Sequence, residues 1–178
     1  MVVCLPHRAD GSGMGGPFDI LVEQHRELEE RFEDLGAGED ESGSSSVVRE
    51  LVALLRHHLW LEERCLQPWV TRVEGRARGR QQAGDRQAMH ELLDEMEEHP
   101  LQSAEWQARF LTLEDLWVAH LQEVESSLLP RLTSVMDPRE QQALAQELSR
   151  SRLDTRSSAS EAGFSGSGPF LDDLRWEG

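Results

Sequence analysis

A duplicated pattern of histidines and carboxylates constrains the fold of this chain more than any other feature. Residues 58–68 and 120–130 share one arrangement, in which His-Leu is followed by an acidic residue, a leucine and a proline at nearly matching positions. Residues 25–30 and 90–95 share another, in which a histidine is followed by a leucine and two acidic residues. The two arrangements alternate along the chain, so the sequence predicts a duplicated helical hairpin that holds a metal site.

The hydrophobic pattern predicts helices throughout. Apolar residues recur at intervals of three, four and seven, and no segment alternates in the way a half-buried strand does. The expected helices span residues 17–36, 47–73, 85–98 and 103–135, with a short fifth helix over 137–150. Short loops between the main helices favour antiparallel neighbours. We therefore predict an all-α fold, an up-down-up-down four-helix bundle with a short fifth helix and disordered termini.

Several residues mark where these helices begin, end or bend. Ser103 suits an N-cap, and Asp137 followed by a proline and then Glu140 has the pattern of a capped helix start. Pro68 is expected to kink or locally open the second helix near its end. Residues 74–84 are rich in glycine and arginine, so we expect a loop there.

The domain organisation follows from the composition of the two ends. Residues 1–16 are rich in glycine and show no period, which predicts a disordered tail. Residues 17–150 form the predicted domain, and residues 151–178 a flexible tail rich in serine and glycine. Residues 169–176 of that tail hold apolar and acidic side chains that could contact a protein partner or the bundle. A disordered end without such a role is at least as good an interpretation.

The charge and composition exclude several classes of function. The net charge of −16, from 34 acidic and 18 basic residues, opposes binding to nucleic acids or to anionic membranes. No apolar run approaches the roughly 18 residues of a membrane span, and residues 1–6 are too short for the apolar part of a secretory signal. We therefore expect a cytoplasmic protein, with reduced thiols at Cys4 and Cys65. The absence of tyrosine excludes iron enzymes that store a radical on that residue.

The histidines and acids have the spacing of metal ligands. His58 and Glu62 lie four residues apart, hence on one face of a helix, whereas His120 and Glu125 are five apart and reach a common centre less easily. Imidazoles with carboxylates suit iron, manganese or zinc better than calcium or magnesium. In an antiparallel bundle four histidines, His90 among them, can meet at one depth. Four histidines with two glutamates exceed the needs of one tetrahedral ion, and two carboxylate-bridged ions would use them all.

These motifs resemble the hemerythrin-like family, also called HHE cation-binding domains, over about residues 17–135. The resemblance rests on the histidine of each helix and on the motifs of residues 58–68 and 120–130. It implies a centre of two non-haem iron ions, with manganese or zinc ranking below iron. The implied ligands are His25 and His58 for one iron, His90 and His120 for the other, and Glu62 and Glu125 as bridges.

The sequence departs from the family pattern at two positions. Many members carry a second histidine where this chain has Asp94, which could be a ligand or a surface residue. Val124 occupies the four-residue position after His120, and the acid stands one residue later, as it does in the oxygen-carrying members. A carboxylate or water in place of an imidazole should stabilise the ferric state, which argues against reversible oxygen carriage.

Other histidines and the thiol have simpler interpretations. A buried histidine satisfied by a neighbouring acid is commoner than a ligand, so His7, His57 and His99 are not expected in the centre. Cys65 fits a small core residue better than a redox-active thiol. A ferritin-like di-iron bundle needs Glu-x-x-His, and no histidine here has a glutamate three residues before it.

The predicted function is a cytoplasmic hemerythrin-like di-iron protein that binds or reacts with O2, peroxide or nitric oxide. Sensing, detoxification or iron and oxygen handling would fit, and a binding or redox role ranks ahead of a dedicated enzyme, with peroxidase-like activity left open. The alternative is a metal-free regulatory bundle that binds a protein partner through its acidic surface or its carboxy-terminal tail. No residue indicates an organic substrate.

Overall fold

The computed structural model describes residues 16–36 and 41–161, and these residues form helices and short connections without a strand. In chain order the segments are α1 (Asp19–Gly36), α2 (Glu41–Leu61), η1 (Glu62–Leu66), α3 (Gln67–Glu74), α4 (Arg76–Glu97), α5 (Ala104–Glu123), η2 (Val124–Leu128), α6 (Leu129–Val135) and α7 (Pro138–Glu161). The segments η1 and η2 are π-helices that join the helices on either side of them, so α2–η1–α3 and α5–η2–α6 are each one continuous helical rod. Together with α1 and α4 they make the four rods of the bundle. Residues 1–15 of the tail predicted for 1–16, and residues 162–178 of the tail predicted for 151–178, lie outside the described residues.

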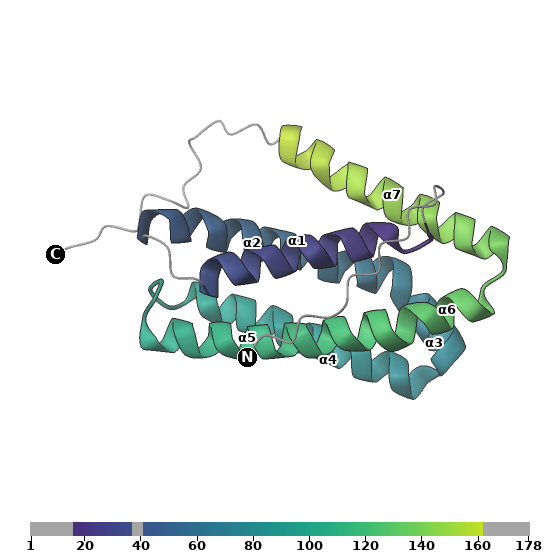
Figure 1. Cartoon of the computed structure of the whole chain (residues 1–178), viewed down its shortest axis with the longest axis horizontal. Helices are drawn as coiled ribbons and strands as arrows, with labels where there is room; N and C mark the ends of the chain where they lie inside the picture. Colours follow the sequence, from purple (N-terminus) through teal and green to yellow (C-terminus); the bar gives the residue numbers. More distant parts are fainter. Residues whose placement is uncertain (1–15, 37–40, 162–178) are drawn as a thin grey trace.

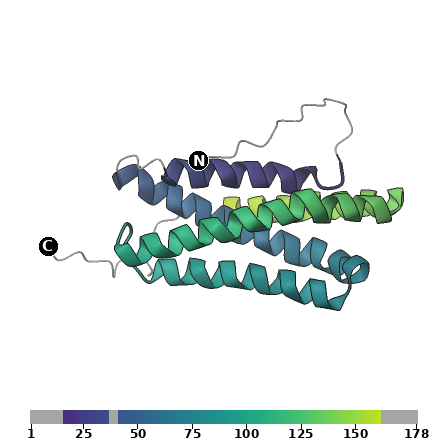
Figure 2. The same ribbon diagram turned by 60° about the horizontal axis from the view of Figure 1, so that its bottom comes forward.

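Four rods pack side by side and alternate in direction (Figures 1 and 2). Helix α1 packs on α2, α3 on α4, and α4 on α5. The predicted all-α four-helix bundle is confirmed. Helix α2 begins at Glu41, earlier than the predicted start at residue 47. In the part of the chain that is described, no helix is both long and apolar enough to cross a membrane.

The prediction of a loop over residues 74–84 is wrong. Helix α3 runs to Glu74 and α4 begins at Arg76, so the turn consists of Gly75 alone. Gly75 has a φ of 89°, a conformation that costs glycine little and other residues much. The arginines and glutamines that follow are good helix formers. A Cβ at Gly79 would lie 2.6 Å from Thr71 Oγ1, so this glycine lets α3 and α4 approach closely.

The fifth helix is present, but it is longer than predicted. Its start has the predicted cap, because Asp137 Oδ1 accepts the N–H groups of Arg139 and Glu140 at 2.8 and 2.9 Å. Glu140 Oε2 accepts the Asp137 N–H at 3.0 Å in return. The helix was expected to end near Arg150 and continues to Glu161. No glycine or proline interrupts residues 151–161, so no strong helix terminator is present there.

Each π-helix ends two residues before a proline. Pro68 is the second residue of α3, and Pro130 is the second residue of α6. Proline lacks an N–H group, and its ring collides with the carbonyl four residues earlier, so the preceding turn widens. In each case the N–H before the proline donates five residues back, to the carbonyl of Glu62 or of Val124. The local opening predicted at Pro68 is confirmed, and Pro130 has the same effect.

The apolar core consists of two clusters separated by a polar layer. The first cluster is built around Leu21, Leu61, Leu66, Val124, Leu128 and, from α7, Leu144 and Leu148. The second is built around Leu28, Phe32, Leu55, Leu59, Met89, Leu93 and Trp117. On α1 the buried Gln24 and His25 lie between Leu21 of the first cluster and Leu28 of the second, and on the next rod His58 and Glu62 lie on either side of the change from Leu59 of the second cluster to Leu61 of the first. The fold therefore encloses polar side chains in apolar surroundings, where unpaired groups are costly.

Candidate metal centre

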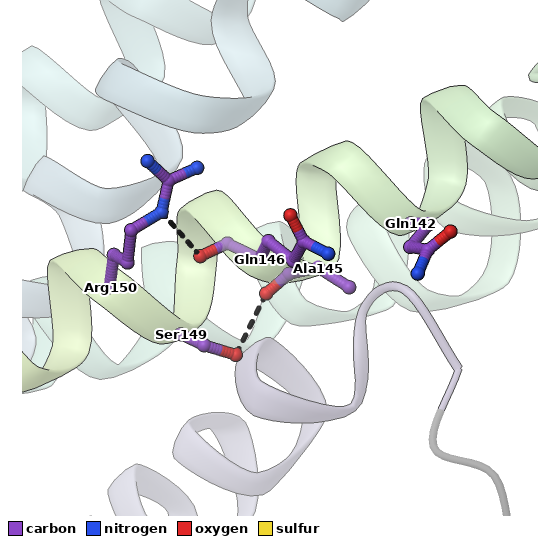
Figure 3. A pocket seen from close by; sticks show the side chains of 5 residues that line it. All are labelled: Gln142, Ala145, Gln146, Ser149 and Arg150. Carbon is purple, nitrogen blue, oxygen red and sulfur yellow. Dashed lines mark hydrogen bonds between the residues drawn. The ribbon is translucent and has the colours of Figure 1, made fainter.

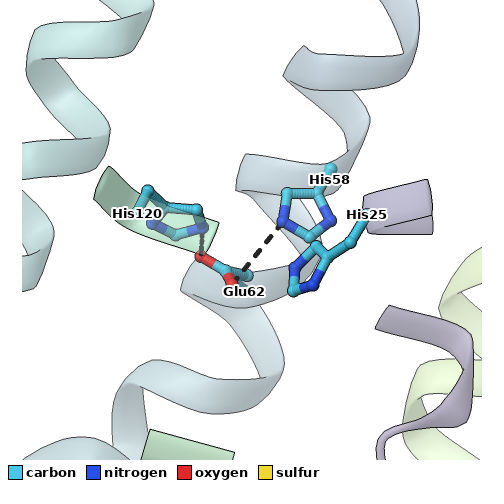
Figure 4. A group of neighbouring side chains, drawn as sticks. All are labelled: His25, His58, Glu62 and His120. Carbon is cyan, nitrogen blue, oxygen red and sulfur yellow. Dashed lines mark ion pairs between the residues drawn. The ribbon is translucent and has the colours of Figure 1, made fainter. Parts of the chain in front are cut away.

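Four side chains from three rods converge in this polar layer. They are His25 of α1, His58 of α2, Glu62 at the start of η1, and His120 of α5 (Figure 4). One donor atom from each lies within 4.8 Å of the donor atoms of the others. His25 and His58 are fully buried, Glu62 is 1% exposed, and the side chain of His120 is 8% exposed. The centre is therefore closed off from bulk water.

Two of the three imidazoles are oriented by partners on their outer side. His25 Nδ1 lies 2.7 Å from Glu125 Oε1, and His58 Nδ1 lies 3.2 Å from Gln24 Oε1. An oxygen acceptor at Nδ1 keeps the proton on that nitrogen and leaves Nε2 with its lone pair. Histidines that bind metals in proteins almost always have a hydrogen-bond partner at the ring nitrogen that does not bind the metal. In both rings Nδ1 thus has its outer partner and Nε2 faces the centre.

The atoms that face one another in the centre have no hydrogen-bond partner. They are the Nε2 atoms of His25, His58 and His120, and Oε1 of Glu62. The closest approaches, 3.3 Å from His120 Nε2 to Glu62 Oε2 and 3.6 Å from His58 Nε2 to Glu62 Oε1, are long for hydrogen bonds. Unpaired buried polar atoms are rare and cost free energy. One cation would satisfy all four atoms, so the residues fit a metal ion.

Burial and mutual proximity also favour the protonation states that bind metal. Burial lowers the pKa of His58 to about 4, with His25 and His120 contributing in the same direction against the effect of Glu62. Burial alone would raise the pKa of Glu62, but His120 and His58 together hold it well below its usual value. At neutral pH the centre therefore offers a neutral imidazole beside an ionised carboxylate, the forms in which both residues bind metals.

Trp117 forms one wall of the centre. Its ring centroid lies 5.6 Å from that of His25, 5.4 Å from that of His58 and 5.5 Å from that of His120. The tryptophan is 1% exposed and belongs to the second apolar cluster. It therefore fixes the three imidazoles against an apolar surface and excludes water from that side.

Comparison with protein families gave one match. Residues 16–132 match the family described as the hemerythrin HHE cation-binding domain. The chain belongs to this family. No curated protein and no solved structure matched the chain. The matched residues include the first three rods, the fourth up to residue 132, and the four residues of the centre, whereas α7 lies beyond them.

The two halves of this HHE domain are not equivalent at the centre. Each π-helix begins four residues after a histidine of the cluster, with Glu62 in the first half and Val124 in the second. Val124 is 3% exposed and joins the apolar core. Glu125 is one residue further, its side chain is 40% exposed, and it contacts His25 Nδ1. The second half thus supplies an imidazole but no buried carboxylate.

His90 and Asp94 do not belong to the cluster. His90 is half-buried on α4, and burial with the nearby Arg56 lowers its pKa. Asp94 is exposed, and its Oδ1 accepts a hydrogen bond from Arg56 Nη2 at 2.7 Å. The structure thus brings together His25, His58, Glu62 and His120, and it places Glu125 against one of them. Metal ligation by all these residues stays a prediction.

Two functional residues of the centre were not predicted from the sequence. Gln24 Oε1 contacts His58 Nδ1, and Arg86 Nη1 lies 3.9 Å from Glu62 Oε2. The buried residues of α4 alternate in steps of three and four, over Gly79, Gln82, Arg86, Met89, Leu93 and Met96. Arg86 lies on this buried seam and His90 is one residue off it. The same spacing, read in the sequence, would have placed Arg86 inside.

The described residues that were not expected in the centre lie outside the cluster of four. His57 is half-buried and stacks on the exposed Trp60 with a ring distance of 5.9 Å. His99 is half-buried beyond the end of α4, and His7 lies outside the described residues. Cys65 is 1% exposed within the first apolar cluster, and burial chiefly raises the pKa of its thiol. A core role therefore fits Cys65 better than a reactive one.

A hollow on α7 has no part in the centre. Its lining consists of Gln142, Ala145, Gln146, Ser149 and Arg150, all from one helix (Figure 3). Ser149 Oγ donates to the carbonyl of Ala145 at 2.8 Å, and Arg150 Nε donates to the carbonyl of Gln146 at 3.2 Å. These polar groups satisfy the helix itself, and the lining contains no metal-binding side chain.

The contact between Glu125 and His25 leads to a first prediction. Replacing Glu125 with alanine should weaken metal binding about 10- to 100-fold, because His25 loses the acceptor that orients its ring and fixes its proton. Competition with a chelator of known affinity, using cobalt(II) as a coloured probe, measures the change. Glu63→Ala is the control, since Glu63 is the exposed second residue of η1 as Glu125 is of η2. Equal affinity of Glu125→Ala and the unaltered protein would contradict the orienting role.

Proposed function

We propose that this chain is a non-haem iron protein whose centre binds or reacts with O2, peroxide or nitric oxide, in sensing, detoxification or the handling of iron and oxygen. The observation that carries the proposal is the set of four buried, unpaired atoms on His25, His58, Glu62 and His120. An arrangement without metal would leave all four unsatisfied in an apolar interior.

The donor set favours iron. Imidazoles with one carboxylate suit first-row transition metals and are poor ligands for calcium or magnesium. Zinc is served by four ligands, and its structural sites leave no open position. Iron held by His25, His58, Glu62 and His120 would supply the binding and exchange of small molecules such as O2, peroxide or nitric oxide. Manganese or zinc in the same place ranks below iron.

The protein's own residues determine how such a centre behaves. Gln24 and Glu125 hold two imidazoles by their Nδ1 atoms, so the ligand positions change little when the charge of the metal changes. Trp117 and the apolar clusters keep bulk water away. The His25–Glu125 contact connects the buried centre to a side chain that is 40% exposed. This is a short path along which a proton can be held or passed to solvent.

The rival function is a metal-free regulatory bundle that binds a protein partner. Its predicted contact segment, residues 169–176, lies outside the described residues. That function gives no role to the buried histidines and Glu62 of the described residues, although burying their unpaired polar atoms costs free energy. We therefore retain the iron proposal alone.

Iron content and ligand-dependent spectra test the proposal. Protein produced with added iron should retain at least about one iron per chain through gel filtration. Azide added to the oxidised form, or nitric oxide added to the reduced form, should change the visible spectrum. Fewer than about 0.5 iron per chain, together with spectra that azide and nitric oxide leave unaltered, would refute the proposal. Peroxide consumed over many turnovers would indicate an enzyme, and consumption of one equivalent a sensor or scavenger.

A further inference from the structure

Arg86 is a buried, permanently charged side chain beside the centre. It is 5% exposed, and its Nη1 lies 3.9 Å from Glu62 Oε2. Its Nη2 donates to Gln67 Oε1, and Gln67 Nε2 donates to the carbonyl of Gly79 at 2.8 Å. These contacts hold the guanidinium between the α2–η1–α3 rod and α4. Arginine stays protonated at every pH at which proteins fold, so a positive charge is present here at all times.

Few charged side chains are buried in the described part of the bundle. Among the residues whose burial is described, Glu62 is the one buried carboxylate near the cluster and Arg86 the one buried arginine; the side chain of Glu74, 6% exposed, pairs instead with Arg78 and Arg131. Both oxygens of Glu62 face other groups, Oε1 toward His58 and Oε2 toward His120 and Arg86. A divalent ion at the cluster, with the guanidinium, already brings three positive charges to one buried negative charge. A second ion would add two more in a medium of low polarity, without a further buried carboxylate.

Of the residues predicted for a second ion, His120 and Glu62 lie in the cluster, and the others are placed elsewhere. His90 lies one residue off the buried seam of α4, which Arg86 and Met89 occupy. Asp94 pairs with Arg56 at the surface, and its side chain is 67% exposed. Glu125 contacts His25 from the outer side. The buried position on α4 opposite Glu62 thus holds a guanidinium.

We propose that the centre holds one metal ion, and that the Arg86 guanidinium takes the place of a second cation as the partner of Glu62 Oε2. This inference rests on the proposed function, since it concerns the same metal site. It revises the two-iron centre that the sequence predicted. The positive charge next to Glu62 repels a second ion and is the reason for the single occupancy.

The number and the magnetic state of the bound ions test the proposal on the full chain. Protein saturated with iron under oxidising conditions should contain about one iron per chain. Its EPR spectrum should show the signal of isolated high-spin ferric ions, with a spin count equal to the iron content. About two irons per chain in an EPR-silent, antiferromagnetically coupled pair would overturn the inference and leave the proposed function intact. Absence of bound metal would refute the proposed function, and this inference with it.

Two substitutions test the role of Arg86 itself. Arg86→Glu replaces the cation with a potential ligand and should raise zinc binding toward about two ions per chain. Arg86→Gln removes only the charge and should let a second, weaker ion bind at high zinc concentration. Arg80→Glu, at an exposed position of the same helix, should stay at one ion. If both Arg86 variants keep the helix content of the unaltered protein and still bind one ion, the assignment to Arg86 is wrong.

Discussion

Replacing His58 with alanine should weaken metal binding by more than about 100-fold, beyond the range seen when an outer partner of a ligand is lost. His58 is fully buried, and its Nε2 is one of the four unpaired atoms of the centre. The substitution removes the proposed ligand atom and leaves a cavity in the buried layer. Iron measured in protein purified from iron-supplemented cells, and zinc affinity measured by chelator competition, should both report the loss.

The adjacent residue provides a matched control. His57 stacks on Trp60 at the surface and contributes no atom to the cluster. His57→Ala should therefore retain the iron content and the zinc affinity of the unaltered protein. Circular dichroism of both variants checks that the bundle has formed. Comparable losses in the two variants would show that the effect is one of folding, and retention of iron by His58→Ala would remove His58 from the centre.

Removing the metal should lower the stability of the bundle markedly. An ion that binds only the folded chain, at a free concentration 1,000 times its Kd, adds about 4 kcal/mol to the free energy of unfolding. For a domain of this size that corresponds to a rise in Tm of roughly 8 to 16 °C. Urea unfolding in the presence of zinc, and again after chelation, measures the difference.

The Glu62→Gln variant separates stabilisation by an ion bound at the centre from other effects of metal ions. The glutamine keeps the shape of the side chain but loses the one buried negative charge of the centre. Zinc should then add less than about 1 kcal/mol at the same concentration. Glu63→Gln, at the exposed neighbouring position, should respond as the unaltered chain does. Identical unfolding curves of the unaltered protein with and without zinc would show that no site couples metal to folding.

Local signals in the sequence predicted much of the fold. The helical period placed the four rods, and Asp137 with Glu140 forms the predicted reciprocal cap. Ser103 Oγ accepts the Trp106 N–H at 3.1 Å, as its N-cap position implied. Pro68 opens the helix before it, because that effect depends only on the proline and the residues just preceding it. Such features are set by neighbours in the chain and are visible without the tertiary structure.

The prediction was weakest along α4. Residues 74–84 were expected to be a loop because glycine and arginine are frequent there, yet a turn of one residue at Gly75 suffices. This earlier start places Arg86 a full ten residues inside the helix, on the buried seam. His90 lies one residue off that seam, and its metal ligation stays a prediction. The resemblance placed a ligand, His90, on the third helix. That helix is rotated in the bundle so that Arg86, one turn before His90, lies on the buried side.

The sequence by itself determined that this chain forms an all-α bundle, that it carries the HHE histidines, and that His58 and Glu62 share a helical face. The tertiary structure decided which side chains meet. Four atoms converge without partners, Glu125 turns to the outer side of His25, and Arg86 faces Glu62. The physical reason is that spacing along one helix sets directions only relative to that helix. Which of those directions lead into a shared, water-free layer depends on how each rod is rotated and distorted against the other three.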